Sequence, residues 1–438
     1  MAATLTSAVA DTCRAARRAA RELALLDTAR KDAALTGIAR ALIERTDEIL
    51  AANALDMESG REAGLGDALL DRLALDEARI ARIAGAVRDI VALPDPVGEA
   101  IEGRRLPNGL DIRRVRVPLG VVAVVYEARP NVTIDATALC LKSGNAIVLR
   151  GSSTATHSNT ALAQIAAEAA VAAGLPEGCI GLVRGGGREE LAQLATQEDT
   201  VDLIIPRGGE GLKAALQEVA TVPVIYAASG NCHIYVDASA DLDLAEAIVL
   251  NAKTQRPGVC NAAETLLVHE AVAQEFLPRI VASLTAAGVS LRADARARAI
   301  AAGAPAARVA VNGTSAAREA TLSEATEEDW ATEYLAATLA IGVVDSVQDA
   351  IEHIHRYGSG HSEAILTRDT DAARAFQLGV DAACVYVNAS TRFTDGGEFG
   401  MGAEIGNSTQ KLHARGPIGL RELCTYKYLV TGDGHVRG

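Results

Sequence analysis

The sequence predicts an α/β protein built from two doubly wound parallel-sheet domains, with a small additional β element. Two observations support this fold class. From Gly120 onward, short and fully apolar segments alternate with Ala-rich helical segments, which is typical of parallel strands covered by helices on both faces. The same alternation begins again near Ile234, and 438 residues are too many for one hydrophobic core.

Residues 1–100 are predicted to be helical, and a hairpin follows them. Apolar residues recur with helical spacing between Leu35 and Leu50. The pattern changes within Arg104–Arg113, where Asn108 and Gly109 form the strongest short signal for a β-hairpin. We expect this hairpin to project from its domain before the chain returns at residue 118.

Beyond the hairpin, apolar segments predict two successive sets of strands. The first set is expected at residues 121–125, 146–149, 180–183, 201–205 and 222–226. The second set begins near residue 234 and continues at 265–268, 309–311, 340–344, 363–366 and 385–387, with a last strand at 423–429. Right-handed crossovers would bring the carboxyl ends of the strands to one edge of each sheet, where ligands bind.

Composition and charge exclude several classes of protein. A net charge of −14 argues against a nucleic-acid binder, which usually carries a basic face. No apolar run approaches the ~20 residues that span a bilayer, and the N-terminus lacks the apolar core of a signal peptide. The seven cysteines are scattered and never form a CxxC pair, so neither a disulfide framework nor a zinc site is expected. These features predict a cytoplasmic location.

Cys260 is the most informative residue of the chain. It follows a predicted helix that Pro257 and Gly258 interrupt, so its thiol stands at a sharp chain break downstream of the first sheet. Covalent catalysis by a thiolate uses thiols in such special local environments. A free cysteine is more often a buried apolar side chain, and the local sequence alone leaves that interpretation open.

Two glycine clusters follow predicted strands and lead into helices. They are Arg184–Gly187 and Arg207–Gly209. Backbone N–H groups and the dipole at a helix N-terminus favour phosphate, which indicates a nucleotide site. A GxGxxG fingerprint is absent, and glycine after a strand is often only a turn.

The order of several motifs resembles a known family. The elements that carry the resemblance to the aldehyde dehydrogenase superfamily are, in order, Pro118–Val122, Arg129–Asn131, Lys142–Arg150, Gly174–Gly178, the Cys260 segment and Glu333. Two longer stretches, Gly230–Asp237 and Lys253–Asn261, resemble the signature of the gamma-glutamyl phosphate reductase family within it. The resemblance extends from about residue 10 to the C-terminus.

The resemblance implies an aldehyde-dehydrogenase-like fold with three parts. Residues 1–102 and 118–230 would form a cofactor-binding domain, and residues 231–408 a catalytic domain that carries the cysteine. Residues 103–117 and 409–438 would form an oligomerisation flap from the hairpin and the last strand. The implied activity is NADPH-dependent reduction of L-glutamyl 5-phosphate to L-glutamate 5-semialdehyde and phosphate, in proline biosynthesis, by a homo-oligomer that binds neither nucleic acid nor membrane.

Carried over by position, the resemblance assigns roles to individual residues. Cys260 would attack the acyl phosphate and form a thioester, which hydride from the cofactor then reduces. The side-chain amide of Asn131 would join the backbone N–H of Cys260 in an oxyanion hole, because both steps pass through a tetrahedral oxyanion. Glu333 would contact the nicotinamide ribose. The local sequence also allows Asn131 to be a turn residue and Glu333 to be a solvated carboxylate.

Two departures from the superfamily pattern bear on the reaction and the cofactor. Hydrolytic members carry a glutamate general base where this chain has Ala227, and without that base water is not activated to attack the thioester. NAD-preferring members often place a glutamate shortly after the position of Arg150, where this chain has Ser152 and Ser153. Their hydroxyls supply donors to a 2′-phosphate, which favours NADPH, although they also suit the start of a helix. The predicted cofactor-binding residues are Arg150, Ser152, Ser153, Arg207, Gly208, Gly209 and Glu333.

A substrate with a phosphate and an amino-acid end requires charged partners. Lys253 and Arg256 flank the predicted nucleophile and Arg129 neighbours Asn131, so these three cations are the predicted substrate-binding residues. Surface salt bridges are the alternative role for each of them. Arg392 lies in a later polar loop, and the eight histidines show no ligand spacing, so no metal is expected.

Other functions stay open at this point. A CoA-acylating aldehyde dehydrogenase would also lack the glutamate base, and only the two longer signatures separate it from the acyl-phosphate reductase. A cofactor-free cysteine hydrolase would need a histidine base oriented toward Cys260, which the sequence does not indicate. A non-catalytic module fits least, because the thiol, the oxyanion donor and the ribose glutamate are all retained. Because an acyl phosphate is unstable, contact with the upstream glutamate kinase is a further hypothesis.

Overall fold

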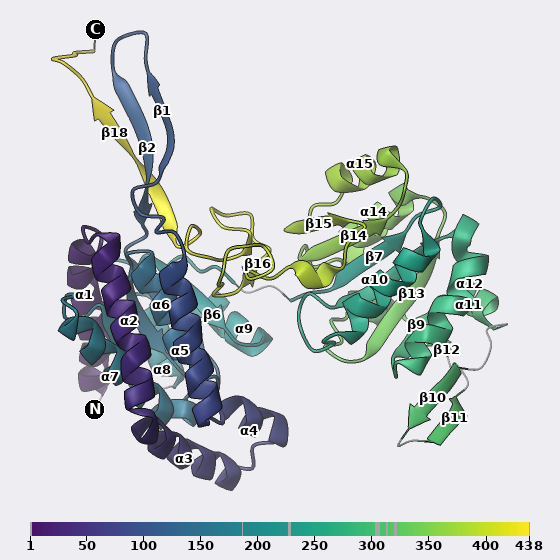
Figure 1. The fold of residues 1–438 in the computed structure, drawn as a ribbon, viewed down its shortest axis with the longest axis horizontal. Coiled ribbons are helices and arrows are strands. Elements are labelled where there is room, and N and C mark those ends of the chain that lie inside the picture. Colours follow the sequence, from purple (N-terminus) through teal and green to yellow (C-terminus); the bar gives the residue numbers. More distant parts are fainter. Residues whose placement is uncertain are drawn as a thin grey trace. The chain divides into compact units, whose positions relative to one another are not determined.

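The structure is a computed structural model that describes residues 2–185, 187–226, 229–302, 307–311, 314–318 and 322–437. The chain divides into two compact units, each with an α/β architecture (Figure 1). Unit 1 comprises Met1–Ala227, Gly400–Gly406 and Leu412–Gly438, and unit 2 comprises Ala228–Phe399 and Asn407–Lys411. The sequence had assigned residues 400–406 to the second domain, whereas they pack with unit 1.

A four-stranded parallel sheet forms the centre of unit 1. Its strands lie in the order β5 (Ile180–Leu182), β4 (Ala146–Arg150), β3 (Val121–Tyr126) and β6 (Leu203–Arg207). β3 and β4 are buried along their whole length, as expected of a sheet covered on both faces. The prediction of a strand at residues 222–226 is wrong. Only Val224 forms a single bridge to Ile204, because Pro223 has no N–H with which to continue a ladder.

Helices complete unit 1, and most of them contribute side chains to one hydrophobic core with this sheet. They are α1 (Ala2–Leu23), α2 (Thr28–Glu44), α3 (Thr46–Glu62), α4 (Asp67–Leu73), α5 (Glu77–Ala92), α6 (Asn131–Lys142), η1 (Ser153–Ala155), α7 (Thr156–Ala172), α8 (Arg188–Ala195) and α9 (Glu210–Val219). The short strand β17 (Gly416–Pro417) also belongs to this unit. None of the described helices of the chain is both long and apolar enough to cross a lipid bilayer.

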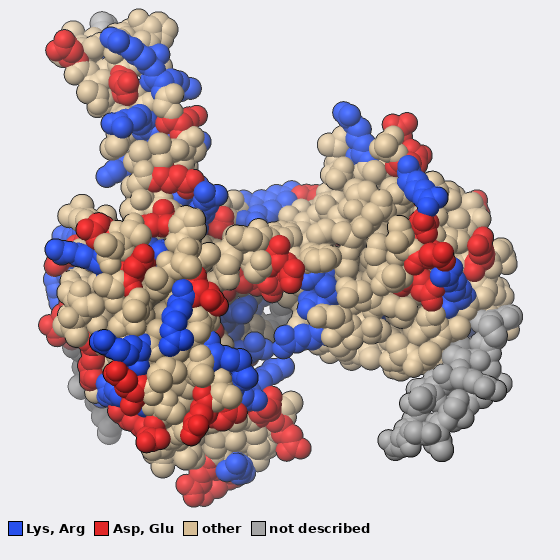
Figure 2. Space-filling view, viewed as in Figure 1, with Lys and Arg blue, Asp and Glu red and all other residues tan. Residues whose placement is uncertain are grey.

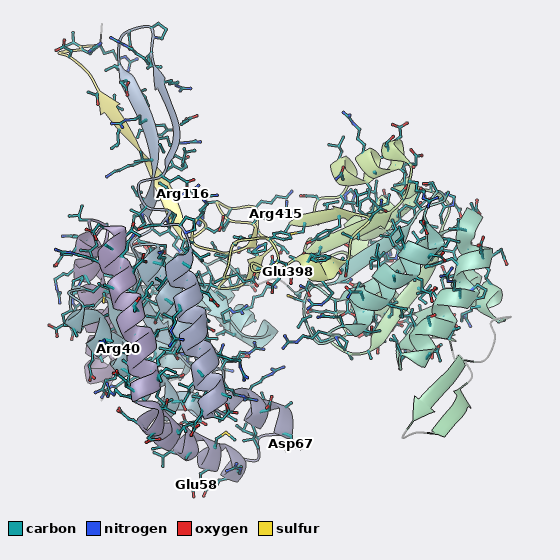
Figure 3. The ribbon with its side chains drawn as sticks, viewed as in Figure 1. Arg40, Glu58, Asp67, Arg116, Glu398 and Arg415 are labelled. Carbon is teal, nitrogen blue, oxygen red and sulfur yellow. The ribbon has the colours of Figure 1, made fainter. Side chains whose placement is uncertain are left out.

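The predicted hairpin and last strand form a separate antiparallel sheet in unit 1. Its strands lie in the order β1 (Ala100–Arg105), β2 (Asp111–Pro118) and β18 (Cys424–Thr431). Gly109 adopts a φ of +94° in the turn, which is the left-handed conformation that the sequence signal requires. This sheet, called the flap below, projects from the helices of unit 1, and Arg116 lies at its base (Figures 1 and 3). The Nε of Arg116 donates to Oε2 of Glu99 at 3.1 Å there.

A seven-stranded parallel sheet forms the centre of unit 2. Its strands lie in the order β12 (Leu322–Glu324), β9 (Ser290–Ala293), β13 (Thr338–Val344), β8 (Ala263–His269), β7 (Cys232–Val236), β14 (Ser362–Leu366) and β15 (Cys384–Val387). Successive residues of β7 and β8 enter two different hydrophobic clusters, since side chains alternate between the faces of a strand. The predicted doubly wound sheet is therefore confirmed for this unit.

The helices of unit 2 alternate with these strands along the chain. They are α10 (Leu242–Thr254), α11 (Glu270–Ala286), α12 (Ala295–Ala301), α13 (Glu327–Ala331), α14 (Val347–Tyr357), α15 (Thr370–Gly379) and η2 (Thr391–Phe393), and the short strand β16 (Asn407–Ser408) follows. The strand predicted at residues 309–311 is not part of the sheet. It belongs to an antiparallel pair of β10 (Ala307–Val311) and β11 (Thr314–Arg318). The sheet instead includes β9 and β12, which the apolar pattern did not single out.

A buried contact from α3 fixes the start of α7, the helix that follows the predicted cofactor loop. Asp56 is only 2% exposed. Its carboxylate accepts hydrogen bonds from the backbone N–H groups of His157 and Ser158 at 3.0 and 2.7 Å, and from Oγ of Ser158 at 2.6 Å. A carboxylate at this end of a helix satisfies unpaired donors and interacts favourably with the helix dipole.

Replacing Asp56 should therefore destabilise unit 1. We expect Asp56→Ala to lower the free energy of unfolding by about 2–3 kcal/mol, because buried donors lose their partner. Asp56→Asn keeps an acceptor oxygen and should lose less. Urea unfolding followed by circular dichroism measures both changes. Equal losses of unfolding free energy in the two variants would show that the acceptor oxygen kept in Asp56→Asn does not stabilise the helix.

Candidate active site

The carboxyl ends of the unit 1 strands carry most of the predicted cofactor-binding residues. Arg150 ends β4 and is followed by Ser152 and Ser153, Arg184–Gly187 follows β5, and Arg207 ends β6 and is followed by Gly208 and Gly209. Of these residues, Gly186 lies outside the described part of the chain. Because the strands are parallel, the three loops share one edge of the sheet, where open α/β sheets bind ligands.

Arg150 is a largely buried residue that supports the glycine-rich loop after β5. It is 8% exposed, and its Nη2 donates to the carbonyl of Gly187 at 2.7 Å. Burial lowers the pKa of its guanidinium, while the nearby charge of Glu190 opposes this shift. Arg150 thus holds the loop that leads into α8, whose first N–H groups favour an anion.

A pocket lies between the start of α7 and the loop after β5. Its lining includes Gly151, Ser152, Asn159 and Arg184. A Cβ on Gly151 would lie 2.1 Å from Nδ2 of Asn159, so only glycine allows this approach. The Oγ of Ser152 accepts a hydrogen bond from the backbone N–H of the residue at position 154 and caps η1, whereas Ser153 is exposed. Ser152 therefore begins a helix, and Ser153 is the serine that faces solvent.

Asn131 begins α6, after the loop of residues 127–130 that follows β3. Its Nδ2 donates to Oδ2 of Asp135 at 2.8 Å, which orients the amide. Burial raises the pKa of Asp135, while the hydrogen bond from Asn131 and the charge of Arg207 act in the opposite direction. The amide nitrogen carries a second hydrogen that can be donated to a ligand oxygen. Arg129, two residues earlier, is exposed.

Cys260 lies in the loop between α10 and β8 of unit 2. This loop enters β8, so it stands at the amino ends of the unit 2 strands, opposite to the edge that the rule for α/β sheets predicts. Asn261 anchors it, because its Nδ2 donates to the carbonyls of Arg392 and Thr394 at 3.3 and 3.0 Å. Cys260 is partly exposed, whereas the other six cysteines are buried. Accessibility therefore selects Cys260 among the thiols as the candidate nucleophile.

The backbone of Gly230 packs against Cys260 without room for a side chain. A Cβ on Gly230 would lie 1.5 Å from the carbonyl oxygen of Cys260, so the position requires glycine. The N–H of Gly230 donates to Oε1 of Glu333 at 2.7 Å. In this structure Glu333 therefore holds the segment beside the candidate nucleophile.

Lys253 and Glu264 form a buried ion pair at the two ends of the Cys260 loop. Nζ of Lys253 lies 2.5 Å from Oε2 of Glu264, and both side chains are fully buried. Burial raises the pKa of Glu264 to about 7 and lowers the pKa of Lys253. The ammonium of Lys253 is fully buried in this structure, where no substrate phosphate reaches it without a rearrangement. The geometry therefore favours a positioning role for Lys253 over the predicted contact with substrate.

Two arginines lie in the surroundings of Cys260. Arg256 is exposed in the same loop. Arg392, in η2, donates from Nε to Oε1 of Gln255 at 2.8 Å. Burial and the charge of Arg256 lower the pKa of Arg392, and the charges of Asp395 and Cys260 oppose the shift. Sequence reasoning noted Arg392 only as part of a polar loop, because no local pattern relates it to a cysteine so far away in the chain.

A buried polar layer lies beneath the Cys260 loop. The Sγ of Cys232 donates to the carbonyl of Cys260 at 3.2 Å, and burial raises the pKa of Cys232 well above its ordinary value. Burial lowers the pKa of His361 to about 4, and its Nδ1 lies 2.8 Å from Oγ of Ser362. His233 is hydrogen-bonded to Glu363 through both its backbone N–H and its Nδ1, which indicates a structural role.

Within each unit, predicted residues from distant parts of the sequence come together. Unit 1 brings Asn131, Arg150 and Arg207 to one edge of its sheet, and unit 2 brings Cys260 and Glu333 to Gly230. Ala227, where hydrolytic relatives carry their base, lies outside the described residues, as does residue 228. Among the residues that are described, no group of three His, Cys, Asp or Glu side chains is arranged to hold a metal ion.

Comparison with known proteins gives consistent matches over nearly the whole chain. Residues 1–312 match the aldehyde dehydrogenase family. The gamma-glutamyl phosphate reductase of Moorella thermoacetica is 58% identical over 422 residues, which cover 96% of this chain and 97% of that protein. The enzyme of the same name from Thermobifida fusca is 54% identical with the same coverage.

A solved structure agrees with the fold. The crystal structure of gamma-glutamyl phosphate reductase from Thermotoga maritima has a TM-score of 0.93 at 47% sequence identity. The match covers 98% of this chain and 100% of that chain. The agreement therefore covers both units and the flap.

The close approach of Gly230 to Cys260 predicts a sharp effect of a single methyl group. Gly230→Ala should lower the turnover number by about 100-fold, because a displacement of roughly 1 Å at a reacting group costs that much. Gly258→Ala is the matched control in the Cys260 loop, since its Cβ would meet only the carbonyl of Leu335 at 3.5 Å. Steady-state kinetics on folded protein compare the two, and equal activities would show that the Gly230 contact does not position the thiol.

Proposed function

The chain belongs to the aldehyde dehydrogenase family, and from this premise we propose that it acts as a gamma-glutamyl phosphate reductase. It is an oxidoreductase that uses a nicotinamide cofactor to reduce L-glutamyl 5-phosphate to L-glutamate 5-semialdehyde and phosphate, a step of proline biosynthesis. The observation that carries the proposal is 58% identity to a protein of that name along nearly the whole chain. A CoA-acylating aldehyde dehydrogenase is not favoured, because the relatives of high identity bear the reductase name.

The proposed reaction proceeds through a thioester on Cys260. The thiolate attacks the acyl carbon, the bond from that carbon to the phosphate oxygen breaks, and phosphate leaves. When bound, the nicotinamide cofactor supplies the hydride that reduces the thioester carbon. The resulting oxyanion on the Cys260 adduct collapses, which releases the aldehyde and regenerates the thiolate. The absence of a carboxylate at Ala227 supports reduction over hydrolysis, because water then lacks a general base.

Asn131 and the backbone N–H of Cys260 are the proposed donors to the oxyanion. Both addition steps place negative charge on the same oxygen, and preoriented donors stabilise it. The assignment of Asn131 rests on its position in the family motif. Its hydrogen bond to Asp135 supports the assignment, because an amide that is already oriented loses little entropy when it binds.

The loops of unit 1 fit a dinucleotide. Glycines at positions 151, 187 and 208 stand where a Cβ would clash with neighbouring side chains, so the backbone is closely packed at the edge of the sheet. The N-termini of α8 and α9 supply N–H groups for phosphates. We assign Arg150, Ser152, Ser153, Arg207, Gly208 and Gly209 to this cofactor, and Glu333 to its nicotinamide ribose. The serines in place of an acid support a preference for NADPH.

Arginines are the proposed partners of the anionic substrate. Arg256 and Arg392 both lie near Cys260, and a pair of guanidinium groups suits a phosphate that carries two negative charges. Arg129 is exposed beside Asn131 and is assigned to the substrate as well. Lys253 contributes through its ion pair with Glu264.

The flap is the proposed site of self-association. Its strand β18 exposes Tyr426, Tyr428 and Val430, with relative accessibilities of 50%, 52% and 56%. Figure 2 shows Lys and Arg side chains along the same projecting element. Exposed apolar and aromatic side chains on an edge strand are suited to pairing with a second copy of the chain.

Seven free cysteines support a reducing, cytoplasmic location. Contact with the upstream glutamate kinase remains a prediction.

The activity is tested in the reverse direction. Protein with glutamate 5-semialdehyde, phosphate and NADP⁺ should produce NADPH, and Cys260→Ser should lower the rate by at least about 1,000-fold because it removes the nucleophile. Cys13→Ala, which changes a buried thiol of α1, is the matched control and should retain the rate. The absorbance of NADPH gives the rate for the unaltered protein and for both variants. Turnover that is equal without phosphate would instead indicate a hydrolytic dehydrogenase.

The cofactor preference is tested at Ser153. Ser153→Glu places a negative charge where the 2′-phosphate of NADPH is proposed to bind, so its KM for NADPH should rise by roughly 10-fold or more. Its KM for NADH should change little or fall. Ser153→Ala removes the hydroxyl without adding charge and separates the two effects. A rise of equal size for both cofactors would contradict the placement of the 2′-phosphate at this loop.

A further inference from the structure

The ion pair between Lys253 and Glu264 joins the two ends of the Cys260 loop. Lys253 lies in the last turn of α10, and Glu264 is the second residue of β8. The distance of 2.5 Å between Nζ and Oε2 therefore closes the loop that contains the nucleophile. A closed loop has fewer conformations than one held only by its helix and strand.

Glu264 also holds a second segment. Its Oε1 accepts a hydrogen bond from the backbone N–H of Leu335 at 3.3 Å. Leu335 adopts a φ of +51°, a left-handed conformation that is rare for a branched residue and needs support from its surroundings. Two residues earlier in this segment, Glu333 accepts the hydrogen bond from Gly230, whose backbone packs against the carbonyl of Cys260. The carboxylate of Glu264 thus connects both ends of the Cys260 loop to the segment that contains Glu333 and Leu335.

Stability does not explain why this pair is ionic. Both side chains are fully buried. The desolvation of two charges often exceeds their attraction, and apolar side chains of the same size are commonly as stable or more stable. The raised pKa of Glu264 and the lowered pKa of Lys253 have burial as their largest cause, which is the signature of this penalty.

We propose that Glu264, paired with Lys253, is a positioning residue for the reaction at Cys260. Glu264 holds the Cys260 loop and the segment of residues 333–335 in one fixed arrangement. This inference rests on the proposed function for its consequence in turnover, although the geometry of the loop can be tested without any substrate.

Three variants separate positioning from mere stabilisation. Glu264→Gln keeps the shape and removes the charge, Lys253→Met breaks the pair, and the double variant Lys253→Met with Glu264→Leu replaces it by an apolar contact of similar volume. We expect the double variant to unfold at or above the temperature of the unaltered protein. We also expect its turnover number, and that of Glu264→Gln, to remain at least about 10-fold lower, with smaller changes in KM.

Alkylation of Cys260 by iodoacetamide is the second measurement. Mass spectrometry of the peptide that contains Cys260 gives its rate, and this rate should fall in the Glu264 variants even if the substrate assignment is wrong. Lys31→Met is the matched control, because it breaks a buried ion pair with Asp95 in unit 1. It should lower stability without changing the alkylation rate. A double variant with unaltered turnover and alkylation would overturn the proposal, since the pair would then be structural only.

Discussion

A parallel strand that is buried on both faces leaves only its two ends for chemistry, and both units of this protein are organised by that constraint. β3, β4 and β7 have no exposed residue along their length. Polar groups accordingly gather in the loops. In unit 1 these are the loops at the carboxyl ends, which begin after Arg150 of β4 and Arg207 of β6. In unit 2 they are the loops at the amino ends, because Cys260 precedes β8 and Cys232 begins β7.

The loops of unit 2 are held by buried polar contacts rather than by apolar packing. Gly230 fits against Cys260 only because it lacks a side chain. Asn261, the next residue after the nucleophile, is bonded to η2, and Glu264 is bonded to Lys253 and Leu335. Each of these contacts requires the desolvation of polar groups, which is unfavourable. A network whose members are hydrogen-bonded also makes the site rigid, which matters where a fixed geometry is needed. The chemistry assigned to Cys260 has that need, since attack and hydride transfer both require a defined position of the acyl carbon.

The proposed reaction depends on what the site lacks as much as on what it contains. A thioester awaiting hydride is lost if water is activated beside it, and the chain has Ala227 where relatives carry a base. Neither His361 nor His233, the histidines beneath the Cys260 loop, replaces that base. His361 is buried with a lowered pKa, and His233 is bonded to Glu363. Arg256 and Arg392 lie near the thiol, and their positive charges suit an anionic substrate.

The sequence by itself predicted the fold class, the hairpin and the chain break before Cys260 from local patterns, whereas the role of Cys260 as nucleophile followed from the resemblance to a family. Apolar runs define buried strands, Asn108 and Gly109 define a turn, and Pro257 and Gly258 break a helix. It failed where a single local pattern was ambiguous, as with the strand expected at residues 222–226, where Pro223 interrupts the ladder. It also missed β9 and β12, whose short segments have no continuous apolar run.

Only the tertiary structure decided what the charged residues do. Lys253 lies seven positions before the thiol and was expected to bind substrate, yet it is buried against Glu264. Arg392 carries no local signal, yet it is bonded to Gln255 beside the thiol. The physical reason is that the partner of a charge is chosen by proximity in space, and strand order in the sheet, which brings distant loops together, is not encoded in the spacing of neighbouring residues.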